Sequence, residues 1–312
     1  MSSQLDTPSL APENDALSKV RRPRFGIGRA LRAAGAALQW RLLLWCALLL
    51  LLPALVAALP VWQMLSASLD HSVYAGQLAA RLDMLAIADL VGNVVERWGP
   101  ALSAGGLVAL VLTLLLSPLL SGMTIAAARA PGRLGMSALL AGGAQEYGRM
   151  LRMLVWAAIP LGIAGALAGA AFHAAGNTAA TAILESDAVH ASRIATVAAA
   201  AVLLIVHATI DAGRALIGSE RRRTSAVLAW WGGVKLLLRR PLALLGSYLV
   251  ITVLGLAVAA LLALARLQVP ALGAGGTVEA LLLTQLAVLA LGWMRSARLF
   301  ALIALARDQA TR

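Results

Sequence analysis

The residues of this chain that could do chemistry are few, and the most prominent group is three ionisable side chains within one apolar stretch. His207, Asp211 and Arg214 are spaced four and three residues apart, so on an α-helix they share one face. Ionisable groups inside a membrane-spanning segment are rare, face the interior of a helix bundle and are functional candidates by default. The group is therefore a candidate functional cluster.

A structural interpretation of the same three residues stays open beside the functional one. Asp211 and Arg214 have the spacing of an ion pair on one helix, and His207 can donate a hydrogen bond to a backbone carbonyl. Asp211 lies within one turn of the expected end of its helix. That position favours the structural interpretation.

Motifs for catalysis and metal binding are absent from the sequence. It contains no His-Glu-x-x-His, no phosphate-binding loop ending in Gly-Lys-Ser/Thr and no Gly-x-Ser-x-Gly elbow. His173 and His190 flank a segment with Glu185 and Asp187, but solvated loop residues explain this group better than a metal site does. The single cysteine, Cys46, excludes an internal disulfide and a Cys-rich metal site. We therefore expect no catalytic, cofactor-binding or metal-binding residues, no cofactor and no enzymatic activity.

The composition indicates which elements must position these residues. Of the 312 residues, 61% are apolar and 13% are charged, and the mean hydropathy is +0.84. Soluble domains average about 45–50% apolar and about 25% charged residues, so a soluble globular protein is excluded. Aromatic residues make up only 4%, and the apolar residues are mainly Leu and Ala, which favours helices over a β-barrel.

Six segments have the length of about 20 apolar residues that a helix needs to cross a bilayer. We predict an all-α integral membrane protein with six transmembrane helices. A membrane domain over 25–300 is expected between a disordered cytoplasmic tail, 1–24, and a second cytoplasmic tail, 301–312. The predicted spans are 42–61, 101–121, 153–173, 194–213, 242–265 and 278–296.

The distribution of basic residues predicts the orientation of these helices. Of the 26 Lys and Arg residues, 22 lie in four segments that alternate with the predicted spans, namely 1–41, 122–152, 214–241 and 295–312. Cytoplasmic loops of membrane proteins carry this excess, so both termini are expected in the cytoplasm. The net charge of +12 then needs no nucleic-acid partner. We expect an integral protein of the bacterial cytoplasmic (inner) membrane.

A repeated pattern divides the predicted membrane domain into three parts. Every second span ends on a small residue followed by arginine, at Ala128-Arg129, Gly213-Arg214 and Ala297-Arg298. Amphipathic segments over 133–152 and 221–240 align at an offset of 88, and 29–41 is a degenerate third copy. We therefore predict three helical hairpins, each preceded by an amphipathic helix on the inner leaflet.

The second amphipathic segment is the clearest candidate for a lipid interface. Basic residues near an anionic membrane surface contribute about 1 kcal/mol each, and tryptophan favours headgroup depth. We expect membrane lipids, chiefly anionic ones, as partners. The alternative is a helix that packs against the ends of the spans and contacts lipid only incidentally. The candidate interface residues are Arg221, Arg222, Arg223, Trp230, Trp231, Lys235, Arg239 and Arg240.

Glycines in the third predicted span form a small-xxx-small motif. Gly165 and Gly169 are four residues apart, a spacing that permits close approach of two helix backbones in a membrane. We expect this motif to pack helices within one chain.

Two groups of short motifs carry a resemblance to known proteins. The first is SPLLSG at 117–122 with AAAR at 126–129 and ALLAG at 138–142; the second is DAGRA at 211–215 with LLLRRP at 236–241. Together they resemble uncharacterised polytopic inner-membrane proteins of bacteria, including the membrane domain of some glycerophosphodiester phosphodiesterases. The resemblance covers about 25–300 and implies a six-helix fold without assigned chemistry. The sequence holds no soluble phosphodiesterase domain, so no catalytic residue is transferred.

Two classes of function stay open. The first is a non-enzymatic membrane protein that organises lipids or a partner membrane protein. The alternative is a transporter or flippase-like carrier of a hydrophobic or amphipathic solute. A carrier usually needs a more polar midplane than these spans provide, so the first class is favoured.

Overall fold

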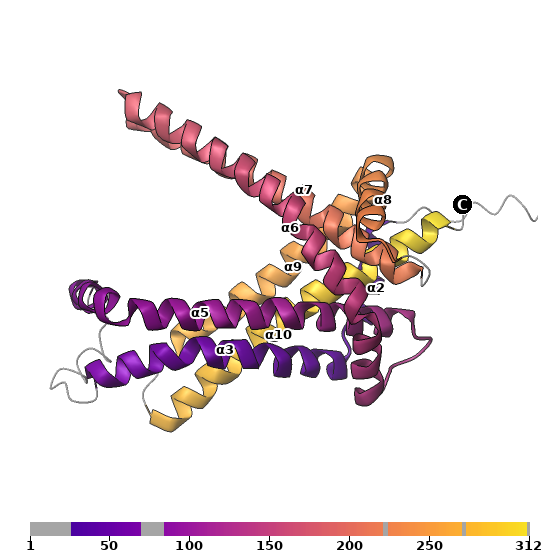
Figure 1. Cartoon of the computed structure of the whole chain (residues 1–312), viewed down its shortest axis with the longest axis horizontal. Helices are drawn as coiled ribbons and strands as arrows, with labels where there is room; N and C mark the ends of the chain where they lie inside the picture. The colour runs from indigo at the N-terminus through magenta and orange to yellow at the C-terminus, as the bar shows by residue number, and fades with distance from the viewer. Residues whose placement is uncertain (1–25, 70–83, 221–223, 270–272, 311–312) are drawn as a thin grey trace, which may run out of the picture.

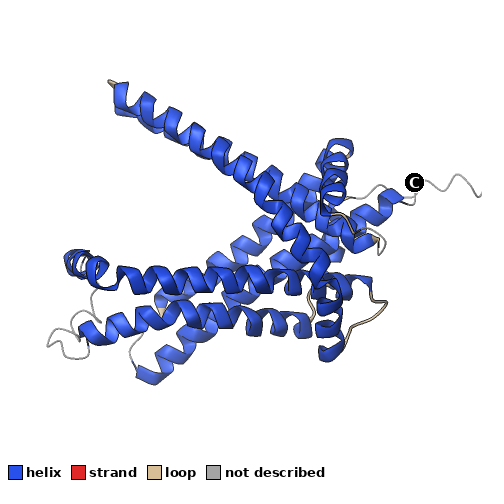
Figure 2. Ribbon diagram, viewed as in Figure 1, coloured by secondary structure: helices blue, strands red, loops and turns tan. Residues whose placement is uncertain are grey.

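The computed structural model describes residues 26–69, 84–220, 224–269 and 273–310, and within these ranges the chain forms helices and no strands (Figures 1 and 2). Leu- and Ala-rich segments become helices because lipid offers no hydrogen bonds, so each backbone group must be paired within its own segment. The helices are α2 (Ile27–Ala36), α3 (Trp40–Leu69), α5 (Met84–Arg129), α6 (Met136–Thr181), α7 (Glu185–Ser219), α8 (Ala226–Arg239), α9 (Pro241–Gln268) and α10 (Gly273–Ala310).

Six of the described helices are long and apolar enough to cross a membrane: α3, α5, α6, α7, α9 and α10. The predicted all-α membrane protein with six spans is confirmed at this level. The helices extend beyond the predicted spans, and α10 continues to Ala310. Residues 301–310, which belong to the predicted cytoplasmic tail, form the last turns of α10. Leu302 and Leu305 are buried there. The 1–24 tail lies outside the described residues.

The buried core lies where the C-terminal halves of α5, α7 and α10 meet, a region that we call the junction. Met123 of α5, Ile210 and Ile217 of α7 and Leu302 of α10 are almost fully buried in one hydrophobic cluster. The short helices α2 and α8 pack against this region, α2 on α10 and α8 on α7. Their buried positions are mostly alanine or glycine, which allows close packing.

Away from the junction the long helices contact one another mainly in sequential pairs, α3 with α5, α6 with α7 and α9 with α10. Figure 1 shows the α6–α7 pair diverging from α3 and α5. Large apolar side chains on these arms are exposed, including Val155 of α6, Val197 of α7 and Leu107 of α5. Exposed apolar surface of this extent is unusual in soluble proteins and is the surface that lipid covers in a membrane.

Glycines bring helix backbones into contact at the junction. A Cβ added at Gly233 of α8 would lie 2.6 Å from the Thr209 carbonyl oxygen and 2.9 Å from the Gly213 nitrogen, both on α7. By contrast, a Cβ at Gly165 or Gly169 of α6 would meet no atom within 4 Å. The expectation that this motif packs helices within the chain is therefore wrong for the described residues.

A buried ion-pair group ties α5 and α6 to the end of α7. Glu146 of α6 pairs with Arg129 of α5 and with Arg149, whose Nη1 is 2.6 Å from Glu146 Oε2. Both arginines donate to the carbonyl oxygen of Ile217, and Arg129 also donates to that of Gly218. The last carbonyls of a helix lack partners within the helix and carry partial negative charge. The two arginines therefore stabilise the C-terminus of α7.

The contact at Gly233 predicts that two glycine-to-alanine substitutions affect the midpoint of thermal unfolding differently. Alanine in an exposed helix position is favoured over glycine by about 1 kcal/mol, but overpacking costs about 1–3 kcal/mol. Gly233→Ala should lower the midpoint of thermal unfolding in detergent, whereas Gly165→Ala should leave it unchanged or raise it. Equal midpoints for both variants would show that α7 and α8 are not in backbone contact.

Candidate functional site

Asp211 and Arg214 form a buried ion pair on the C-terminal half of α7. Arg214 Nη1 lies 2.8 Å from Asp211 Oδ1, and their side chains are 13% and 9% exposed. The carboxylate is positioned by the buried turns on either side of it, which pack into the junction. This is the i,i+3 pair that the spacing of the two residues allows.

Two arginines of α10 join this pair, and sequence reasoning did not select them. Arg295 Nη2 donates to Ser117 Oγ of α5 at 2.6 Å and to Ser121 Oγ at 3.3 Å. Arg298 Nη1 donates to the Tyr248 hydroxyl of α9 at 2.8 Å, and its guanidinium lies over the Tyr248 ring at 4.7 Å. Four helices, α5, α7, α9 and α10, therefore contribute side chains to one polar site.

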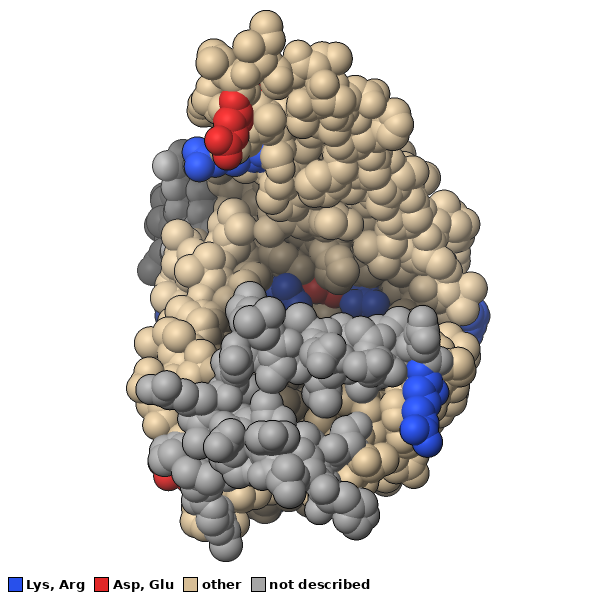
Figure 3. All heavy atoms as spheres, turned by 90° about the vertical axis from the view of Figure 1, so that its left-hand side faces the viewer, with Lys and Arg blue, Asp and Glu red and all other residues tan. Residues whose placement is uncertain are grey.

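We call Asp211, Arg214, Arg295, Arg298 and Tyr248 the arginine cluster. Asp211 interacts electrostatically with all three arginines. Since one carboxylate faces three guanidinium groups, the cluster carries excess positive charge. Figure 3 shows basic and acidic atoms at the base of a hollow whose walls are neither basic nor acidic.

His207 lies one turn from Asp211 but is exposed rather than buried. It interacts electrostatically with Asp211 and with the three arginines. Within the part of the chain that the structure describes, His207 makes no hydrogen bond to a backbone carbonyl, contrary to the structural interpretation of its role. It therefore lies at the edge of the arginine cluster.

The sequence contains a signal for the two missed arginines. Arg295 and Arg298 are three residues apart at the end of the last predicted span, as Asp211 and Arg214 are at the end of the fourth. In the sequence, Arg298 stands out only as the arginine that ends the third copy of the repeat. The serines and the tyrosine that receive these arginines lie on other helices, so only the fold connects them.

The two tryptophans of the predicted lipid interface on α8 have different surroundings in the structure. Trp230 packs against Trp156 of α6, with ring centroids 5.9 Å apart, and donates to Thr209 Oγ1 of α7. Trp231 is half exposed, and Lys235 Nζ lies 5.9 Å from its ring centroid. Trp230 thus contacts protein, and Trp231 is available to lipid.

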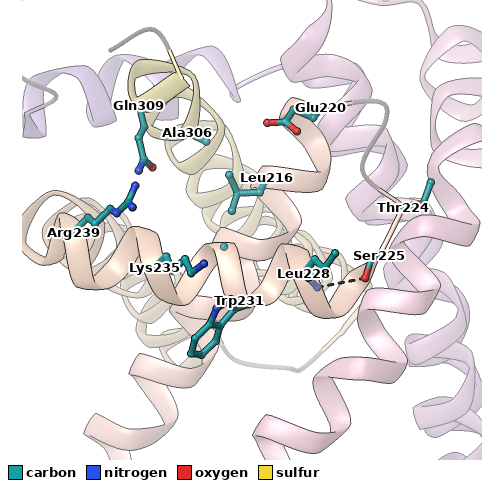
Figure 4. Close-up of a pocket in the computed structure, with 11 residues that line it drawn as sticks. Leu216, Glu220, Thr224, Ser225, Leu228, Trp231, Lys235, Arg239, Ala306 and Gln309 are labelled. Atoms are coloured by element: carbon teal, nitrogen blue, oxygen red, sulfur yellow. Dashed lines mark hydrogen bonds between the residues drawn. The ribbon is translucent and has the colours of Figure 1, made fainter.

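The basic residues of this interface also differ in their surroundings. Arg240 pairs with Asp308 of α10 at 2.8 Å, so it ties α8 to α10. Lys235 and Arg239 are exposed. They line an open groove of about 680 Å³ between α8 and the ends of α7 and α10 (Figure 4). Arg221, Arg222 and Arg223 lie outside the described residues.

The described ranges offer few side chains that could bind a metal ion or a cofactor. These ranges contain no group of three or more His, Cys, Asp or Glu side chains that could hold a metal ion. Cys46 is buried on α3, near Arg295 and Ser296. The arrangement at the junction is suited to binding an anion by hydrogen bonds and charge.

Comparisons with known proteins identify no relative of this chain. No family model, no curated protein and no solved structure matches the chain. The site must therefore be interpreted from its own geometry.

The buried pair predicts a coupled effect on stability. Removing one partner of a buried ion pair leaves an uncompensated charge and costs about 3–5 kcal/mol. Asp211→Asn and Arg214→Gln should each lower the unfolding midpoint, and the double variant should recover part of the loss. Asp187→Asn, in the exposed first turn of the same helix, is the control and should cost at most about 1 kcal/mol.

Two other outcomes of this experiment would change the interpretation. If Asp211→Asn abolishes activity in vivo while folded protein stays in the membrane at a normal level, the pair is functional rather than structural. If all three variants keep the normal level, midpoint and phenotype, the pair has neither role.

Proposed function

We propose that this protein is a non-enzymatic membrane protein that organises lipids, or a partner membrane protein, around its splayed helices. The observation that carries the proposal is the arginine cluster, whose excess positive charge lies among helices that expose apolar faces. A charged site next to apolar surface matches a lipid, which joins a polar headgroup to acyl chains. The geometry offers no comparable match to a soluble substrate.

The proposal includes a repeated architecture in one orientation. The three sequential pairs would be hairpins, each preceded by an amphipathic helix on the inner leaflet, with both termini in the cytoplasm of a bacterium. Close glycine contacts join α5 to α6, at Gly122 and Gly143, and α7 to α8, at Gly213 and Gly233. The last long helix, α10, contacts the short helix α2. The excess of arginine near the junction supports the cytoplasmic side for these ends.

The exposed face of α8 supports anionic lipids as partners. Trp231 and Leu238 expose apolar surface beside the basic Lys235 and Arg239. Such a combination is typical of helices that lie in a membrane interface. The burial of Trp230 reduces the proposed interface to the outer face of the helix.

A second candidate function is a carrier of an amphipathic solute. The convergence of polar side chains from α5, α7, α9 and α10 favours it, because the space between these helices is less apolar than each helix suggests alone. Transbilayer movement of a fluorescent phospholipid in proteoliposomes separates the two functions. Protein-dependent movement supports the carrier, and binding without movement supports the organising role.

Reporter fusions test the orientation. Fusions after residues 75, 180 and 270 should report the outside, and fusions after 140, 225 and 312 should report the cytoplasm, because arginine-rich segments are retained there. One reversed interior reporter would mean that a span has been miscounted.

Lipid enrichment tests the organising role. The protein purified from membranes of mixed anionic and zwitterionic lipid should retain anionic lipid in excess. Replacing both Lys235 and Arg239 by Gln should reduce the excess several-fold, since each basic residue contributes up to about 1 kcal/mol. Replacing Arg193, exposed at the opposite end of α7, should not. No enrichment in the unaltered protein would contradict the proposal.

A further inference from the structure

The arginine cluster has more hydrogen-bond donors than the protein satisfies. A guanidinium carries five N–H donors, yet the hydrogen bonds of Arg214, Arg295 and Arg298 each use one terminal nitrogen. Arg298 Nε is buried and has no partner among the described residues. Neither Arg295 nor Arg298 forms an ion pair with a carboxylate within the described ranges.

The other buried charge group shows what a satisfied arrangement looks like. Around Glu146, both carboxylate oxygens are paired with arginine, and the arginines also donate to carbonyl oxygens at the end of α7. The arginine cluster has no second carboxylate and no such row of carbonyls. Charge buried without a partner is unfavourable, and more so among membrane-spanning helices, so its excess positive charge calls for an anion.

We infer that Arg214, Arg295 and Arg298 form a binding site for one phosphate oxyanion where α5, α7, α9 and α10 meet. The site deepens the proposed function, on which it rests for the nature of its ligand. The phosphate of a lipid headgroup and free inorganic phosphate offer the same chemistry: oxygens that accept paired hydrogen bonds from the planar fork of arginine.

The surrounding residues define how the anion is held. Ser117 and Ser121 hold one edge of Arg295, and Tyr248 holds Arg298 from the face and from the hydroxyl, so both guanidinium groups are fixed before an anion binds. Asp211 offsets the charge of one arginine, so the charge left on the other two attracts a single phosphate.

The apolar arms favour a lipid as the source of that phosphate. Exposed apolar side chains lie on the α6–α7 arm and on α5, so acyl chains have a surface to cover once the headgroup is bound. A free phosphate has no acyl chains, so other lipids would have to cover these surfaces.

Binding of phosphatidylglycerol to the full-length, delipidated protein in detergent tests the site. Native mass spectrometry and thermal unfolding should show one saturable lipid per chain and a higher midpoint. Arg295→Gln and Arg298→Gln should each weaken binding at least about tenfold. Arg193→Gln, at the exposed start of α7, is the matched control and should bind like the unaltered protein.

Two variants keep the test informative if the glutamine variants unfold. Arg298→Lys keeps the charge but loses the planar fork, so binding should weaken less than in Arg298→Gln. Asp211→Asn removes the competing carboxylate, so its folded fraction should bind phosphatidylglycerol more tightly than the unaltered protein. Weaker binding by Asp211→Asn would overturn the inference.

A second arm distinguishes the two sources of phosphate. Inorganic phosphate at millimolar concentration raises the midpoint by itself and displaces the lipid if the site takes free phosphate. If only phosphatidylglycerol does so, and phosphatidylcholine does not compete, the ligand is an anionic lipid. Either result supports an oxyanion site. Binding that stays unchanged in Arg295→Gln and Arg298→Gln overturns the inference.

Failure of this site and failure of the proposed function give different results. If replacing Lys235 and Arg239 leaves lipid enrichment unchanged while lipid still binds at the arginine cluster, only the role of α8 is contradicted. Normal enrichment without binding at the cluster contradicts only the site. Absence of both contradicts the proposed function itself.

Discussion

The burial of the C-terminal half of α7 is the constraint on which the rest of the structure depends. This stretch is enclosed by α6, α8 and α10, and its small residues let the neighbouring backbones come close, most of all at Gly213 and Gly233. Arg129 and Arg149 complete its C-terminus by donating to carbonyl oxygens. Because α7 also carries Asp211, the same packing places the one carboxylate of the arginine cluster.

The two buried charge groups of the junction differ in how far their arginines find partners. Glu146 lies between two arginines that find further partners at the end of α7, so this group is self-sufficient and holds three helices together. Asp211 faces three arginines, two of which end on hydroxyl groups alone. Hydroxyl groups position a guanidinium without neutralising it. The first group therefore stabilises the fold, and the second is the basis of the proposed anion site.

The arms and the junction differ in packing and therefore in their proposed roles. The junction has a packed core, and the arms expose large apolar side chains. In the proposed role, the arms present a lipid-facing hollow and the junction supplies its polar base. Two separate lipid contacts follow from this division, one at the arginine cluster and one on the outer face of α8.

Much of the architecture was determined by the sequence alone. Runs of about 20 apolar residues have one stable form in a bilayer, because only a helix pairs its own backbone groups there. The helical class and the six spans could thus be predicted, and so could the i,i+3 pair of Asp211 and Arg214, which needs no other element. Helix ends were less predictable, since α10 continues to Ala310 with Leu302 and Leu305 buried beyond the predicted span.

Which residues meet between helices was decided by the tertiary structure. Arg295 lies 178 residues from Ser117, and Arg298 lies 50 from Tyr248; no local pattern joins residues so far apart. Trp230 and Trp231 are neighbours in sequence, but the close approach of α8 to α7 turns one toward Trp156 and leaves the other exposed. Gly165 and Gly169 have the spacing for close packing and meet no helix. Periodicity specifies which face of a helix is apolar, but it does not specify which surface covers that face, because every apolar face in a membrane can be covered by lipid as well as by protein.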